Sequence, residues 1–187
     1  VKELCPDAKH YGDTYDRYGL LENGIMAHCV YTEGEELSAL KARGTMICHC
    51  PQSNTNLCSG VAPIRYFLEE NVKVGLGTDV AGGANLSMLR AITDAISVSK
   101  LRFRLMDQSL APLTLEEAFC LATLSGGSFF GKVGSFLPGY EADALVFHEK
   151  RRSVRKQTVK ERLEVLLYTG EESARLQAKF VQGRQLF

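Results

Sequence analysis

The sequence lacks an excess of charge of either sign, because 22 lysine and arginine residues balance 22 aspartate and glutamate residues. With no net charge and no extended basic cluster, nucleic acid is not expected as the main partner. The densest basic segment, Lys150–Arg152 with Arg155 and Lys156, is interpreted as a solvated surface segment. No apolar run approaches the roughly 18 residues that cross a bilayer, which argues against a membrane partner.

Several motifs that carry well-known chemistry are also missing. The chain has no GxGxxG or Walker sequence for binding phosphates, no GxSxG nucleophile elbow and no CxxC pair. Its first residues do not have the pattern of a signal peptide. The six scattered cysteines are therefore expected to be reduced thiols in the cytoplasm rather than disulfides.

What the chain does contain is a pattern that occurs three times, a short apolar run that ends in a histidine or an aspartate. The runs are Gly24–His28, Gly44–His49 and Val72–Asp79. Short apolar runs of this kind are typical of buried parallel strands. Within the third run, Gly75 and Gly77 leave room for close approach of a ligand or another backbone.

Helical patterns lie between these runs and after them. Helices are predicted over residues 33–42, 63–70, 87–101 and 114–124. The last of these begins with Thr114 and Glu117 at the spacing of a capping box. Alternation of strands and helices predicts an α/β architecture with a parallel sheet.

The character of the sequence changes near residue 131. A turn-rich stretch leads to a predicted strand over 143–147, and residues 180–187 are predicted to form a hairpin with Gly183 in its turn. We therefore expect residues 1–130 to belong to the α/β part and residues 131–187 to a small β module.

The three strand ends suggest where chemistry occurs. Parallel strands end at one edge, so His28, His49 and Asp79 are candidates for a common site. Histidine and carboxylate side chains bind metals and transfer protons near neutral pH. Two alternatives stay open at this point: Asp79 could cap the next helix, and His28 could be a hydrogen-bonded core histidine.

Cys48 and Cys50 flank His49. Strand alternation places both sulfurs on one face and the imidazole on the other. We interpret the two cysteines as small core residues that point away from the cleft expected between His28 and Asp79.

Three segments resemble the amidohydrolase superfamily and, within it, the guanine deaminase family. They are MAHC at 26–29, HCPQSN at 49–54, and GLGTDVAGG at 75–83 followed by SML at 87–89. The resemblance implies a partial TIM barrel of the metal-dependent hydrolase type, in which residues 1–130 supply strands six to eight with their helices. Residues 131–187 would then supply part of a small β-sandwich module.

The resemblance also implies roles for individual residues. Asp79 matches a zinc ligand that takes the proton of the attacking water, and His28 matches a histidine that faces the substrate and that water. His49, Ser53 and Asn54 match a loop that braces the site. One Zn²⁺ per complete subunit, guanine as the purine substrate and a homodimer are implied in the same way.

The remaining part of the superfamily's zinc site is not found in these 187 residues. None of the four histidines belongs to an HxH pair or an HxxE motif. We therefore expect that about 55% or more of a full-length enzyme lies outside the chain, given a typical barrel of roughly 250 residues plus its module. Two other hypotheses are a different deaminase or chlorohydrolase of the superfamily, acting on another purine or a triazine-like ring, and a catalytically inactive fragment.

Overall fold

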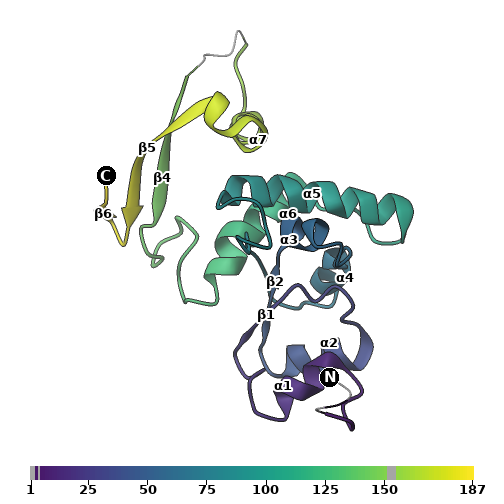
Figure 1. The fold of residues 1–187 in the computed structure, drawn as a ribbon. Coiled ribbons are helices and arrows are strands. Elements are labelled where there is room, and N and C mark those ends of the chain that lie inside the picture. The colour runs from purple at the N-terminus through teal and green to yellow at the C-terminus, as the bar shows by residue number, and fades with distance from the viewer. Residues whose placement is uncertain (1–2, 4, 151–154) are drawn as a thin grey trace.

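The computed structural model describes residue 3, residues 5–150 and residues 155–187, so part of the basic segment at 150–156 lies outside the described residues. Figure 1 shows the arrangement of the elements. In chain order they are α1 (Tyr11–Asp16), β1 (Ile25–Ala27), α2 (Gly34–Ala42), β2 (Met46–His49), α3 (Pro51–Asn56), α4 (Ile64–Glu69), β3 (Val74–Leu76), α5 (Met88–Leu105), α6 (Leu115–Cys120), the π-helix η1 (Leu121–Ser125), β4 (Ala144–Glu149), α7 (Val159–Thr169), the 3₁₀ helix η2 (Gly170–Glu172), β5 (Ala174–Val181) and β6 (Arg184–Gln185).

The first sheet is parallel, with the strand order β1-β2-β3. Ala27 pairs with Cys48, and Cys48 pairs in turn with Gly75. The three predicted strands are therefore confirmed, although their regular portions are only three or four residues long. Because the strands are parallel, the segments that follow β1, β2 and β3 all begin at the same edge of the sheet.

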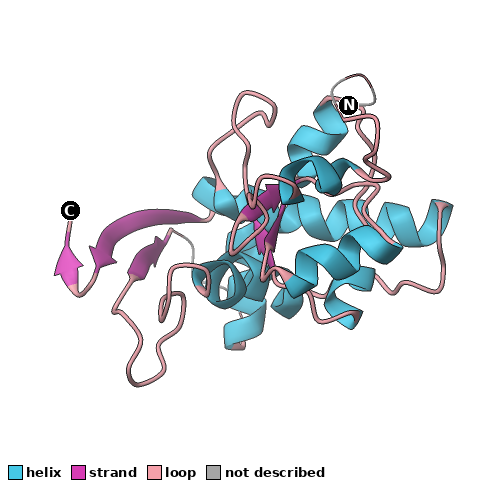
Figure 2. Ribbon diagram, turned by 90° about the horizontal axis from the view of Figure 1, so that it is seen from below, coloured by secondary structure: helices cyan, strands magenta, loops and turns pink. Residues whose placement is uncertain are grey.

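The main hydrophobic core lies between this sheet and its helices, which Figure 2 shows packed against the short strands. Ile47 of β2, Val74 of β3 and Phe67 of α4 are completely buried, and Leu37 and Leu40 of α2 join the same cluster. Burying each such side chain contributes about 1.5–3 kcal/mol relative to exposure. This packing holds the strands, and hence the segments at their ends, in place.

Two helices after the sheet begin with side-chain caps. Ser87 accepts a hydrogen bond from the backbone of Arg90 at the start of α5. The capping box predicted for Thr114 and Glu117 is confirmed at the start of α6. The helix α5 is longer than predicted and ends at Leu105. Among the described residues, no helix has the length and apolar character needed to span a membrane.

The second sheet is antiparallel, with the order β4-β5-β6. The hairpin predicted near the C-terminus is confirmed, and its turn contains Gln182 and Gly183, both with positive φ. The sequence predicted only strands in this region, whereas the structure also contains α7. Leu167 of α7 packs with Ile92 and Ile96 of α5, which joins this region to the rest of the chain. Figure 1 shows α7 between the second sheet and α5.

Candidate active site

The side chains of His28 and Asp79 meet at the edge where β1 and β3 end. The imidazole Nε2 lies 3.7 Å from the carboxylate Oδ2, and both side chains are about two-fifths exposed. This agrees with the convergence expected from their shared position at strand ends. The alternative for Asp79 is excluded, because Ser87 rather than Asp79 caps α5. His28 is hydrogen-bonded, as its alternative required, but its side chain is only partly buried.

Both residues have an unusual backbone conformation. His28 has φ 70° and Asp79 has φ 45°, and their neighbours Cys29 and Ala81 have φ 48° and 97°. Residues other than glycine rarely adopt positive φ, at a cost of about 1–3 kcal/mol each, and such residues cluster at functional sites. The surrounding contacts must therefore hold these two turns in place.

Asn54 of α3 determines how the imidazole of His28 is oriented. Nδ1 of His28 lies 2.8 Å from Oδ1 of Asn54. An amide oxygen only accepts, so Nδ1 must carry the proton and donate. In the neutral ring this leaves a lone pair on Nε2, the nitrogen that faces Asp79.

Three further polar side chains are almost completely buried: His49 is 1% exposed, Ser53 0% and Asn54 2%. They were expected to lie in a loop, but Ser53 and Asn54 belong to α3, which begins with Pro51 in the first helical turn. Proline suits this position because it has no N–H to leave unpaired.

Burial changes the protonation of His49. Removal from water, together with the nearby charge of His28, lowers the pKa of His49 to about 3. Within the described part of the chain, both ring nitrogens of His49, the hydroxyl of Ser53 and the amide nitrogen of Asn54 have no hydrogen-bond partner. His49 is therefore a buried, neutral imidazole near enough to His28 to be affected by its charge.

The turn after Asp79 packs tightly against α3. A Cβ atom at Gly82 would lie 2.6 Å from Oγ of Ser53 and 3.0 Å from Oδ2 of Asp79. Both oxygens therefore converge on Gly82, and a larger residue there would push them apart. Gln52 and Asn56 also bond to this turn, and the sequence analysis did not identify either as a site residue.

The sulfurs of the two cysteines beside His49 lie on one face, as strand alternation predicted, and both lie next to Gly77. That they point away from the cleft between His28 and Asp79 stays a prediction. Their sulfurs lie 3.8 Å apart, and a Cβ atom at Gly77 would lie 2.6 Å from Sγ of Cys48 and 3.2 Å from Sγ of Cys50. Their mutual hydrogen bond lowers the pKa of Cys48 and raises the pKa of Cys50, while burial and, to a smaller extent, the charge of Asp79 act to raise both. Gly77, two residues before Asp79, thus leaves room for the two sulfur atoms. Gly75 approaches the backbone of Gly126, as expected for a glycine at a close contact.

The residues of this site fit a metal centre only in part. An exposed carboxylate such as that of Asp79 is a suitable zinc ligand, but zinc sites use three or four protein ligands. Among the described residues, no group of three or more histidine, cysteine, aspartate or glutamate side chains is arranged to hold a metal ion. The described residues therefore do not form a zinc site by themselves.

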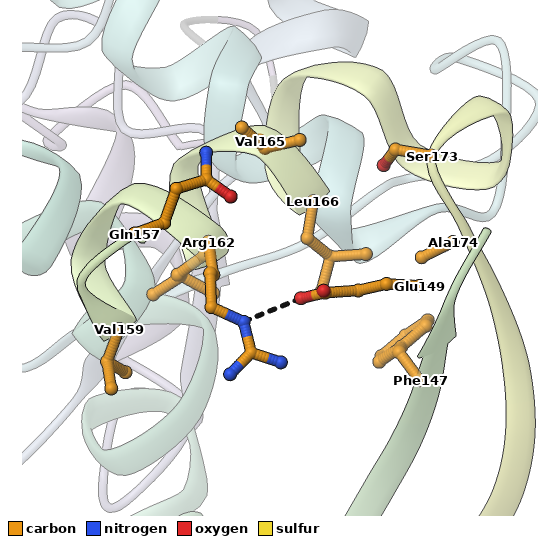
Figure 3. A pocket seen from close by; sticks show the side chains of 10 residues that line it. Phe147, Glu149, Gln157, Val159, Arg162, Val165, Leu166, Ser173 and Ala174 are labelled. Atoms are coloured by element: carbon orange, nitrogen blue, oxygen red, sulfur yellow. Dashed lines mark hydrogen bonds and ion pairs between the residues drawn. The ribbon is translucent and has the colours of Figure 1, made fainter. Parts of the chain in front are cut away.

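A separate cavity of about 230 Å³ lies between α7 and the second sheet (Figure 3). Its lining includes Phe147, Leu163 and Leu166, together with Arg162 and Glu149. The last two form an ion pair at 2.6 Å, so each already neutralises the charge of the other. Neither His28 nor Asp79 lines this cavity.

The fold and the site agree with a known protein family. The sequence profile of the Amidohydrolase family matches residues 5–176, and the chain belongs to this family. Its similar relatives include the guanine deaminase of Homo sapiens, which is 44% identical over 156 residues, equal to 80% of this chain and 34% of that protein.

Solved structures give the same result. A guanine deaminase from C. acetobutylicum with guanine bound in its active site is 38% identical and superposes with a TM-score of 0.93, covering all of this chain and 45% of that protein. An adenosine deaminase from Xanthomonas campestris with bound zinc shares the fold, with a TM-score of 0.74 over 99% of this chain and 43% of that protein at 24% identity. The chain thus spans between a third and a half of the length of these relatives.

Proposed function

We propose that the complete protein is a guanine deaminase, which converts guanine and water into xanthine and ammonia. The observation that carries the proposal is the His28–Asp79 pair, held at strand ends in a chain 38% identical to a guanine deaminase with guanine in its active site. Ring deamination by water needs a group that accepts a proton and groups that orient the water, and this pair offers both.

Asp79 is proposed as the group that takes the proton from the attacking water, and as the one metal ligand in this chain. A bound zinc ion would lower the pKa of water toward 7 and so supply hydroxide at neutral pH. With Nδ1 of His28 committed to Asn54, Nε2 is free to accept a hydrogen bond from the attacking water. Both groups also face the purine ring, which is attacked at C2.

His49, Ser53 and Asn54 are proposed to brace this pair. Their nearly complete burial gives them fixed positions, and Asn54 bonds directly to His28. The other metal ligands and the second proton-transfer group would come from a part of the protein outside these residues.

The same proposal includes a finer description of the fold. Three parallel strands with helices on one side are what strands six to eight of a TIM barrel would supply, with residues 1–130 as that part. Ile25 on β1 is 45% exposed, which fits a strand whose neighbour lies outside the chain. Residues 131–187 would contribute to a β-sandwich module. We also infer a cytoplasmic homodimer, and the six cysteines, all free, fit a reducing compartment.

The test uses the complete polypeptide, purified and supplied with zinc. Guanine, adenine, another aminopurine and an amino- or chlorotriazine are offered at equal concentrations, and the ammonia or chloride released is measured. We expect guanine to be the best substrate and xanthine its product. Preference for the triazine, or for another purine, would favour the alternative amidohydrolase instead.

A further inference from the structure

The turn that follows Asp79 is tightly closed. The backbone N–H of Gly83 donates to the carbonyl of Asp79 at 2.5 Å, and Ala81 has φ 97°. A Cβ atom at Gly83 would lie only 2.1 Å from the carbonyl oxygen of Thr78. Such a turn persists only where neighbouring groups hold it.

Side chains of α3 provide that support. Oε1 of Gln52 accepts two hydrogen bonds, from the backbone N–H of Ala84 at 2.9 Å and from Nδ2 of Asn85 at 3.0 Å. Nδ2 of Asn56 donates to the carbonyl of Gly82 at 2.8 Å. Gln52 and Asn56 are four positions apart and therefore lie on the same side of the helix.

The contact made by Gln52 extends to the next helix. Asn85, held by Gln52, accepts a hydrogen bond from the backbone N–H of Ser87 at 2.9 Å, and Ser87 is the cap of α5. The segment from Asp79 to Ser87 is thus anchored to α3 near its middle. On the same helix, Asn54 bonds to His28.

We propose that Gln52 is a positioning residue, which holds the segment 79–87 so that the carboxylate of Asp79 faces His28. Asn56 assists it from the next turn of α3. The helix α3 therefore aligns both members of the pair, Asp79 through Gln52 and His28 through Asn54. The catalytic consequence rests on the proposed deaminase function, whereas the anchoring of the segment does not.

The experiment compares variants of the complete polypeptide. Gln52→Leu removes the acceptor and keeps a side chain of similar size, and Gln52→Glu keeps an oxygen that accepts from the same two donors. Asn56→Ala tests the second anchor at an exposed position, so it remains informative if Gln52→Leu fails to fold. Thr55→Ala is the control, because Thr55 lies on the same helix and its hydroxyl donates to the carbonyl of Pro51 within α3.

Two readouts are taken: hydrogen–deuterium exchange of the peptide covering 80–87, and kcat and KM for guanine. Gln52→Leu should raise exchange in that peptide and lower kcat by about tenfold, with a smaller change in KM. Asn56→Ala should act in the same direction, to a smaller extent. Gln52→Glu should bring both the exchange rate and kcat most of the way back to the values of the parent protein. Thr55→Ala should match the parent protein in both readouts.

Unchanged exchange in this peptide for both Gln52→Leu and Asn56→Ala would overturn the proposal, as would faster exchange with unchanged kcat. An equal loss in Gln52→Glu and Gln52→Leu would also contradict it, because the acceptor would then be irrelevant. If the parent protein does not turn over guanine at all, the proposed function fails. The exchange measurement still decides the anchoring in that case.

Discussion

Nδ1 of His28 donates a hydrogen bond to Oδ1 of Asn54 at 2.8 Å, although 26 positions separate the two residues in the chain. One residue belongs to the turn after β1 and the other to a helix after β2. Because β1 and β2 are parallel neighbours, both segments begin at the same edge of the sheet. The bond leaves Nε2 as the nitrogen that can act on a substrate.

Replacing Asn54 should therefore impair the proposed deaminase activity through His28. In the complete polypeptide, Asn54→Leu should lower kcat by roughly 10–100-fold, the range typical for residues that orient a catalytic or metal-binding histidine. Asn54→Asp keeps the acceptor and should retain more activity. Equal activity of Asn54→Leu and the parent protein would contradict this role.

The roles of His28 and Asp79 can be separated by their effects on bound metal. Asp79→Ala in the complete polypeptide should abolish turnover and weaken zinc binding, because a ligand is lost. His28→Ala should lower the rate but leave zinc in place, since His28 is assigned to the substrate and the water. Zinc content by metal analysis, measured beside kcat, checks both statements. Equal loss of zinc in the two variants would show that the roles are wrongly assigned.

The 187-residue chain by itself should have no deaminase activity and no tightly bound zinc. Asp79 is the one ligand proposed here, and a single carboxylate does not hold the metal. A sheet whose edge strand exposes Ile25 should also favour association with other chains. The purified chain is incubated with zinc and guanine, and xanthine and bound metal are measured. Turnover that survives further purification, or one tightly held zinc per chain, would refute the prediction.

The protonation of His49 predicts how stability depends on pH. In the folded protein burial keeps the pKa of His49 at about 3, against 6.5 for an ordinary histidine. Between these values only the unfolded chain binds the proton, so stability increases with pH across this window and is lost as the pH falls. At pH 5 the free energy of unfolding should be about 2 kcal/mol lower than it is above the pKa of an ordinary histidine.

Urea unfolding of the complete polypeptide between pH 5 and pH 7.5 checks this expectation. His49→Met removes the titrating group, so the free energy of unfolding of this variant should lose about 2 kcal/mol less than that of the parent protein as the pH falls to 5. His148→Gln is the control, because His148 is exposed on β4. If His49→Met and the parent protein lose stability in parallel as the pH falls, the burial of a neutral His49 is not the cause.

Much of the local structure could be predicted from periodicity and capping. The three short apolar runs predicted the three parallel strands, and the spacing of Thr114 and Glu117 predicted where α6 begins. Both predictions succeeded because strand and helix starts depend on residues that are close together in the chain. The sequence did not predict α3 or α7. The helix α3 has no apolar residue after Pro51 and therefore shows no hydrophobic period. The helix α7 begins with a capping box at Thr158 and Glu161, the same signal that predicted the start of α6, but this signal was missed.

The candidate site also has features that the sequence predicted and features that only the structure shows. The sequence alone determined that His28, His49 and Asp79 stand at strand ends, since the order of apolar and polar residues carries that information. Only the tertiary structure decided that Gln52, Asn54 and Asn56 reach across to these ends, and that the sulfurs of Cys48 and Cys50 lie next to Gly77. Such contacts depend on the angle at which α3 leaves the sheet. The helix α3 packs against α5, which lies far along the chain, and no local pattern in the sequence encodes such a contact.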